Sequence, residues 1–135
     1  QPGAFAFRIY RNYDGAGSRF GDTSISAAST DQDRLAVYAA QRANGVVTAV
    51  VINKTAAPLT GEVTLSNVPA APAAQVYRYS AAALDAIVRQ ANQPLGPTGF
   101  TATFPAESIT LFVVRPDLTL YSIYLPLIVR ADLYP

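Results

Sequence analysis

The sequence feature that most constrains the fold is a pair of β-rich runs joined by a tight turn. Leu35 to Gln41 leads into Ala43-Asn44-Gly45, and Val46 to Asn53 follows immediately. Asn-Gly between two such runs is a strong hairpin signal, because both residues tolerate the positive φ that short hairpin turns need. The second run is apolar on both faces, which predicts a strand in the middle of a sheet or one with a neighbour packed outside it. We therefore expect a sheet built around this hairpin.

Strand signals recur along the rest of the chain. Further strands are expected at residues 23–28, 62–66, 75–80, 100–104 and 108–114. Turn signals that separate such runs every eight to twelve residues or so are typical of sandwiches. The sequence predicts an all-β fold, an antiparallel β-sandwich of about 6–8 strands.

Two segments allow more than one interpretation. Ala4 to Tyr13 fits both a strand alternation and a helical i, i+4 stripe, but Gly15 and Gly17 follow it and suit a helix C-terminus. A short N-terminal helix is therefore expected. Ala81 to Gln90 is interpreted as a helical turn or an irregular excursion, and the Pro- and Gly-rich stretch 92–99 as loop.

Composition excludes several functions. The formal net charge is +1, and the basic residues are scattered arginines with the single lysine Lys54, so no nucleic-acid partner is expected. Neither cysteine nor histidine is present, which removes thiol chemistry, the commonest general base and ordinary zinc sites. No cofactor is expected. The apolar run 120–129 is interrupted by Pro126 and is about half of what a membrane-spanning helix needs.

The connector at residues 11–24 carries the most specific pattern. It holds three glycines, two aspartates and an asparagine, together with Tyr13 and Phe20, whose rings are expected to pack into apolar surface. Its Asn-Tyr-Asp-Gly-x-Gly-Ser-x-Phe-Gly-Asp-Thr-Ser run resembles the junction between catalytic barrel and β-sandwich in family 44 glycoside hydrolases, which are endo-β-1,4-glucanases and xyloglucanases. The closing strand 108–114 is also similar to the end of such sandwiches, and the resemblance covers residues 4–115.

The resemblance implies an organisation in three parts. Residues 1–22 would be the end of a barrel helix and its junction loop, 23–116 the β-sandwich, and 117–135 a C-terminal tail or an added strand. The tail at 124–130 is similar to those ending many secreted bacterial proteins, and an extracellular bacterial location is expected. The family's two catalytic glutamates lie on the barrel and correspond to no position here. The expected function is a non-catalytic accessory domain of a hydrolase acting on cellulose, xyloglucan or xylan, which packs against the (β/α)₈ barrel of its parent chain.

Catalysis within this chain is not expected. A retaining glycosidase needs two carboxyl groups about 5 Å apart. The two glutamates are Glu62, on the predicted solvent-exposed face of an alternating strand, and Glu107, in a predicted turn. Both are interpreted as solvated surface residues.

Three other sets of residues are candidate sites. An interdomain interface is expected from aromatic and aliphatic side chains of the N-terminus and of the last strand's outer face: Phe5, Phe7, Ile9, Tyr10, Tyr13, Phe112 and Val114, beside Val46/Val50 or Val47/Val51. The loop oxygens of Asn12, Asp14, Ser18 and Asp22 suit calcium, although turn hydrogen bonds explain the same residues. A polysaccharide-binding face would use Tyr38, Tyr77 and Tyr79, although aromatic residues at strand period also build cores.

The alternative function is a carbohydrate-binding or surface-adhesion module of a secreted bacterial protein. The three tyrosines favour sugar binding, and the C-terminal tail is the feature that suggests adhesion.

Overall fold

The computed structural model describes residues 2–66, 71–115 and 128–133 of the chain. These residues form one helix, α1 (Pro2–Arg11), and nine strands. In chain order the strands are β1 (Thr23–Ser29), β2 (Leu35–Gln41), β3 (Val47–Asn53), β4 (Leu59–Ser66), β5 (Ala73–Ser80), β6 (Ala83–Pro94), β7 (Gly99–Phe104), β8 (Ser108–Val114) and β9 (Ile128–Leu133). The expected all-β class and the short N-terminal helix are confirmed.

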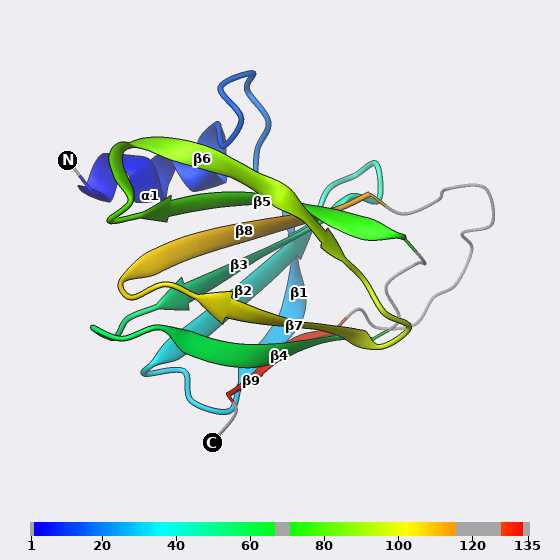
Figure 1. Cartoon of the computed structure of the whole chain (residues 1–135). Coiled ribbons are helices and arrows are strands. Elements are labelled where there is room, and N and C mark those ends of the chain that lie inside the picture. The colour runs from blue at the N-terminus through cyan, green and yellow to red at the C-terminus, as the bar shows by residue number, and fades with distance from the viewer. Residues whose placement is uncertain (1, 67–70, 116–127, 134–135) are drawn as a thin grey trace.

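The strands form a sheet that bends into two layers at β1. Their order is β6-β5-β8-β3-β2-β1-β9-β4-β7. Thr23 to Ile25 pair antiparallel with β2, whereas Ser26 to Ser29 pair parallel with β9. Apart from Ile25, β1 carries small side chains, which suit a strand that turns a corner between layers. Figure 1 shows the result, with β6, β5 and β8 above and β7, β4 and β9 below.

The hairpin that the sequence predicts at Asn44-Gly45 lies at the centre of the larger layer. Residues Leu35 to Gln41 of β2 pair with Asn53 to Val47 of β3 without a break. Gly45 has a φ of 88°, and the Asn44 side chain accepts a hydrogen bond of 3.2 Å from the Val46 amide. The strand β3 pairs with β2 on one side and with β8 on the other, so it is an interior strand, as its apolar sequence predicts.

The space between the layers is filled by an aliphatic and aromatic core. Phe112 of β8 lies at its centre, with its ring centroid 4.8 Å from that of Phe100 and 6.1 Å from that of Phe104. Because Phe112 belongs to the larger layer and its partners to β7 of the smaller one, these rings join the two layers. The other large members are Ile25, Leu35, Val37, Val47, Val51, Val63, Val76, Val114 and Val129.

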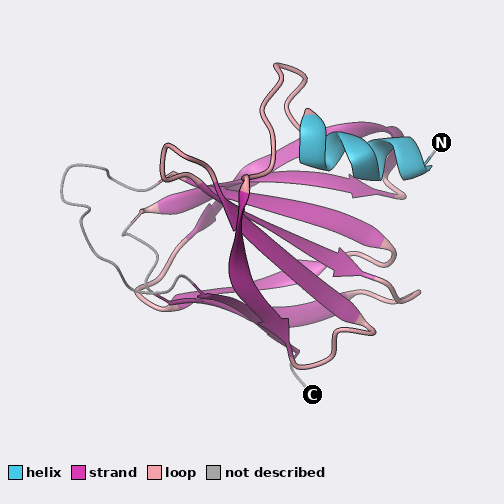
Figure 2. Cartoon of the chain, turned by 180° about the vertical axis from the view of Figure 1, so that it is seen from behind, coloured by secondary structure: helices cyan, strands magenta, loops and turns pink. Residues whose placement is uncertain are grey.

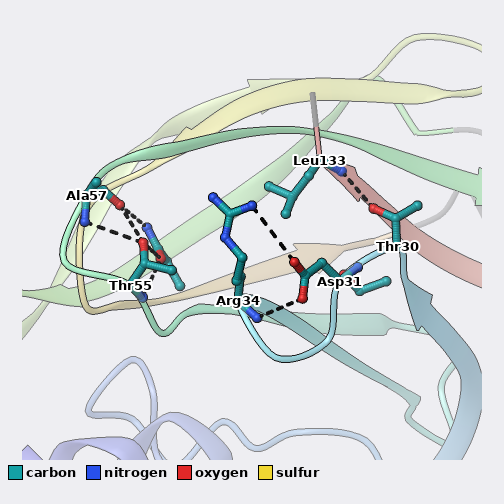
Figure 3. Close-up of polar contacts among 8 residues, drawn as sticks. Thr30, Asp31, Arg34, Thr55, Ala57 and Leu133 are labelled. Carbon is teal, nitrogen blue, oxygen red and sulfur yellow. Dashed lines mark hydrogen bonds and ion pairs between the residues drawn. The ribbon is translucent and has the colours of Figure 1, made fainter. Parts of the chain in front are cut away.

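Polar side chains close the β1–β2 turn and the β3–β4 turn (Figure 3). In the β1–β2 turn, the Asp31 carboxylate accepts a hydrogen bond of 3.2 Å from the Arg34 amide, and the Thr30 hydroxyl accepts one of 3.1 Å from the Leu133 amide. The Thr55 hydroxyl lies 2.9 Å from the Ala57 carbonyl oxygen. The buried Asn53 amide group bonds the Phe104 carbonyl oxygen at 3.1 Å, which ties together two points where the chain crosses between layers.

One element differs from the sequence prediction. Residues 83–94 form the edge strand β6, so the helical or irregular interpretation of residues 81–90 is wrong. The prediction of a loop at residues 92–99 is also wrong for residues 92–94, which belong to this strand. The apolar spacing of Leu84, Ile87 and Val88 reflects the irregular twist of an edge strand that pairs with β5 through two register shifts. The strand β9 lies between β1 and β4 within the smaller layer and falls in residues 117–135, where the sequence allowed a tail or an added strand. With β6 and β9, the described residues form nine strands, more than the six to eight that the sequence predicts.

None of the described residues forms a helix with the length and hydrophobicity that bilayer crossing requires.

Candidate functional site

The N-terminal helix and the loop at residues 12–22, here called the junction loop, cover the outer face of the larger layer. Figure 2 shows the helix lying across that layer on the side away from β4, β7 and β9. Ile9 of α1 has no exposed surface, and Tyr13 at the start of the loop is 2% exposed. They pack against the outer side chains of the sheet, with which they form the outer-face cluster: Ile9, Tyr13, Val46, Val50, Tyr79, Leu111 and Val113.

This arrangement corrects the assignment of Phe112 and Val114 to the outer face. Both side chains point between the layers, with Val47 and Val51, and are 2% exposed. Strand alternation then places Leu111 and Val113 on the outer face with Val46 and Val50. The sequence identified the two faces of this strand but not which of them was covered by the second layer.

Of the other predicted interface residues, Ile9 and Tyr13 contact this chain's own sheet, and Tyr10 packs at the margin of the cluster. The side chains of Phe5 and Phe7 lie outside the described residues.

Side-chain oxygens of the junction loop close its turns. The Asn12 Oδ1 atom accepts a hydrogen bond of 2.7 Å from the Gly17 amide, and the Asp14 Oδ1 atom accepts bonds of 2.8 and 3.2 Å from the amides of Ala16 and Ser18. Gly15 and Gly17 have φ values of 76° and 87°, which favour glycine. The loop is therefore shaped by its own sequence, as the Asn/Asp/Gly pattern predicts.

The same contacts set the ionisation of Asp14. Desolvation acts against the charged form, but hydrogen bonds from the Ser18 hydroxyl and from the backbone amides outweigh it, so the pKa of Asp14 lies below its ordinary value. The described residues contain no group of three or more carboxylate, imidazole or thiol side chains that would hold a metal ion. Asn12 and Asp14 direct their oxygens to backbone amides, and the calcium set with Asp22 stays a prediction.

Tyr13 anchors the loop to the sheet. Its ring centroid lies 4.8 Å from that of Tyr77, and the Arg42 guanidinium lies over the Tyr13 ring, 5.5 Å from its centroid. A guanidinium N–H of Arg42 also donates to the Tyr13 hydroxyl, while Nε donates to the Arg19 carbonyl oxygen at 2.7 Å. Arg42 follows β2 directly, so one side chain fastens both ends of the loop to the central hairpin.

The end of the loop approaches that hairpin closely. The Phe20 amide donates to the Tyr10 carbonyl oxygen at 2.8 Å, and the two rings meet edge to face at 5.0 Å. The Gly21 amide donates to the buried Thr48 hydroxyl at 3.1 Å. A Cβ atom on Gly21 would lie 2.5 Å from the Gln41 carbonyl carbon, so this approach requires glycine.

The structure separates the three tyrosines considered for sugar binding. Tyr38 is 46% exposed on β2. Tyr79 is buried in the outer-face cluster, where its hydroxyl donates to the Leu84 carbonyl oxygen at 2.8 Å. The Tyr77 ring contacts the Tyr13 ring, and the Arg89 guanidinium lies over the Tyr77 ring, 5.3 Å from its centroid. Tyr77 and Tyr79 therefore serve packing, and Tyr38 is the accessible ring of the three.

The two glutamates do not form a pair. Glu62 is exposed on β4 opposite Thr101, whereas Glu107 follows β7 in the turn to β8. Leu59 pairs with Phe104, so the strand rise alone separates Glu62 from the end of β7 by about 10 Å. Beyond Phe104 the chain crosses to the other layer. This spacing does not match the two-carboxylate arrangement of retaining glycosidases.

Two exposed apolar side chains of the described residues were not identified from the sequence. Leu84 and Val88 of the edge strand β6 are 60% and 39% exposed, and β6 contacts α1. The sequence does not predict a strand at residues 83–94, so it does not indicate that these two side chains are exposed.

Fold and site together define an all-β domain of two layers whose larger sheet is covered outside by an N-terminal helix and a shaped junction loop. No protein-family model matches the chain. It is 29% identical over 117 residues to Endoglucanase A of Paenibacillus lautus, covering 84% of this chain and 17% of that protein.

Two solved structures match the fold over a similar range. CelM2, a bifunctional glucanase-xylanase from a metagenome library, superposes with a TM-score of 0.76 at 36% identity, covering 86% of this chain and 22% of CelM2. A Paenibacillus polymyxa xyloglucanase from glycoside hydrolase family 44 gives 0.76 at 26% identity, covering 84% and 23%. The resemblance to family 44 enzymes is thus confirmed. Most of this chain is similar to a part of these enzymes, and it spans about a fifth of their length.

Proposed function

We propose that this chain is a non-catalytic accessory β-sandwich of a family 44-like glycoside hydrolase, secreted by a bacterium and acting on cellulose, xyloglucan or xylan. Its role is to pack against and stabilise the catalytic (β/α)₈ barrel of its parent chain. The observation that carries the proposal is that most of the chain matches enzymes named as glucanases and xyloglucanases but covers 17–23% of each.

Two features of the domain support a packing role. The junction loop is held rigidly on the sheet by Tyr13, Arg42 and Gly21, so it would transmit a fixed orientation to whatever precedes α1. Leu84 and Val88 are exposed apolar side chains of β6, the strand that contacts that helix, and exposed apolar side chains are expected where a second domain is seated.

The absence of catalysis is tested with the purified 135-residue chain. We expect no release of reducing sugar from carboxymethylcellulose, xyloglucan or xylan, because Glu62 and Glu107 are too widely separated to act together. Hydrolysis by a preparation of verified purity, lost on substitution of Glu62 or Glu107 by glutamine, would contradict the proposal.

The existence of a parent enzyme is tested in the source cells with an antibody against this chain. We expect a secreted polypeptide several times larger than 14.3 kDa, since a barrel alone adds about 250 residues. In that polypeptide, Leu84→Ser with Val88→Ser should lower the Tm of the catalytic part, whereas Thr103→Ser on the exposed face of β7 should leave it unchanged. An antibody signal confined to 14 kDa would refute the accessory role.

A further inference from the structure

A groove of about 300 Å³ lies where α1, the junction loop, β1 and β2 meet. Tyr10 of α1, Phe20 of the junction loop and Tyr38 of β2 bring three aromatic rings to its walls. Ser24 and Gln32 add a hydroxyl and a side-chain amide, and the remaining lining residues are Ile25, Ala27, Val37 and Ala39. We call this the aromatic groove.

The lining of the aromatic groove carries no formal charge. Burial, followed by the neighbouring Tyr38 phenol, raises the pKa of Tyr10, so its hydroxyl stays neutral and able to donate. Two nearby grooves differ, because Arg19 and Asp22 line both, with Arg42 in one and Arg11 in the other. An uncharged groove beside two charged ones favours an uncharged ligand.

The rings of the groove are set in place by the fold. Phe20 is fixed by the hydrogen bond from its amide to the Tyr10 carbonyl oxygen and by the edge-to-face contact of the two rings. Tyr38 is the exposed ring, and it stands on a strand paired along its full length with β3. A ligand would therefore meet a preformed surface, which lowers the entropic cost of binding.

We propose that the aromatic groove binds a short segment of a neutral β-1,4-linked polysaccharide, with a sugar ring stacked on Tyr38. A pyranose ring has apolar faces of C–H groups and a rim of hydroxyls, which matches aromatic walls interrupted by hydroxyl and amide groups. The volume is at the small end of ligand sites, about 300–1,000 Å³, and suits a few sugar units. The class of polysaccharide rests on the proposed function, whereas the uncharged ligand rests on the lining itself.

The test is an NMR titration of the isotopically labelled 135-residue chain with cellohexaose and with a xyloglucan oligosaccharide. We expect amide shifts at residues 24–27, 32 and 37–39, and no comparable shifts with an α-linked maltohexaose. Tyr38→Ala should weaken binding about tenfold or more. Tyr38→Phe keeps the ring and should weaken it less than about threefold. Thr103→Ala, on the other layer, should leave the affinity unchanged.

The wild-type titration decides the location even if Tyr38→Ala disturbs the fold. Absence of shifts at millimolar oligosaccharide, shifts confined to other residues, or an affinity that Tyr38→Ala leaves unchanged would each overturn the proposal. A negative titration together with a large parent polypeptide would refute sugar binding alone. A small native polypeptide with shifts in the groove would refute the accessory role and keep the binding site.

Discussion

The two faces of the larger sheet are both buried, but by different means. The inner face packs against a second layer through valines, Leu35 and phenylalanine rings, with few polar groups. The outer face is covered by a helix and a loop. Tyr13, Arg42 and the close approach of Gly21 to the Gln41 backbone hold the loop on the sheet. A sandwich needs only the first kind of burial. The second requires particular residues at particular positions, and it explains why the most specific sequence pattern of the chain is a loop.

The largest effect is expected on the inner face. Phe112→Ala removes the ring that joins Phe100 and Phe104 and should lower the free energy of unfolding by about 4 kcal/mol. Urea denaturation followed by circular dichroism measures it. A loss below about 1.5 kcal/mol would contradict the placement of this side chain between the layers.

On the outer face, Ile9→Ala should lower the free energy of unfolding by about 3 kcal/mol, because it leaves a cavity between α1 and the sheet. Alanine is a good helix former, so the loss would not come from helix propensity. The same denaturation experiment compares it with Val88→Ala, at an exposed position, where a change below about 0.5 kcal/mol is expected. Equal effects of the two substitutions would mean that α1 does not cover the sheet in solution.

Tyr13→Phe tests the polar part of that cover. The ring remains against Tyr77, but the hydroxyl contact with Arg42 is lost, and we expect a loss of about 1 kcal/mol. Tyr38→Phe is the matched control and should change stability by less than about 0.3 kcal/mol. A neutral result at Tyr13 would assign the anchoring of the loop to ring packing alone.

The smallest effect is expected at Asp14, which is exposed. Its pKa is lowered in the folded state, so its ionised form adds stability that is present above about pH 4 and is lost as the pH falls through the folded-state pKa. Asp14→Asn should lower stability at pH 7 by less than about 1 kcal/mol and should flatten the decline between pH 5 and 2. Thermal melts across that range, with Asp33→Asn as the control, measure the difference. An unchanged acid slope would refute the role of its hydrogen bonds.

Much of the fold was predictable because local and tertiary signals agree. The turn residues Asn44 and Gly45 define the β2–β3 hairpin, and Phe100 and Phe104 alternate toward the core as expected. β6 was not predictable, because Leu84 to Val88 carry a weak helical spacing and become a strand only through pairing with β5. The outer and inner faces of β8 are similarly apolar, so the sequence could not tell which would meet the second layer.

The candidate site was predictable only where local sequence determines the structure. Asn12, Asp14 and the glycines fix the loop through local bonds, which a sequence reveals. The aromatic groove brings together Tyr10, Phe20 and Tyr38 from three elements, and no local pattern indicates that juxtaposition.

The position of β9 has a consequence for how the chain is made. A ribosome releases residues 128–133 after every other described strand, yet they sit between β1 and β4 and hydrogen-bond to both. Because β9 links β1 to β4 in the sheet, the paired strands β4 and β7 can join the larger layer through hydrogen bonds only after residues 128–133 have been synthesised. Completion of the smaller layer is therefore coupled to the synthesis of a strand that follows all the other described strands in the sequence.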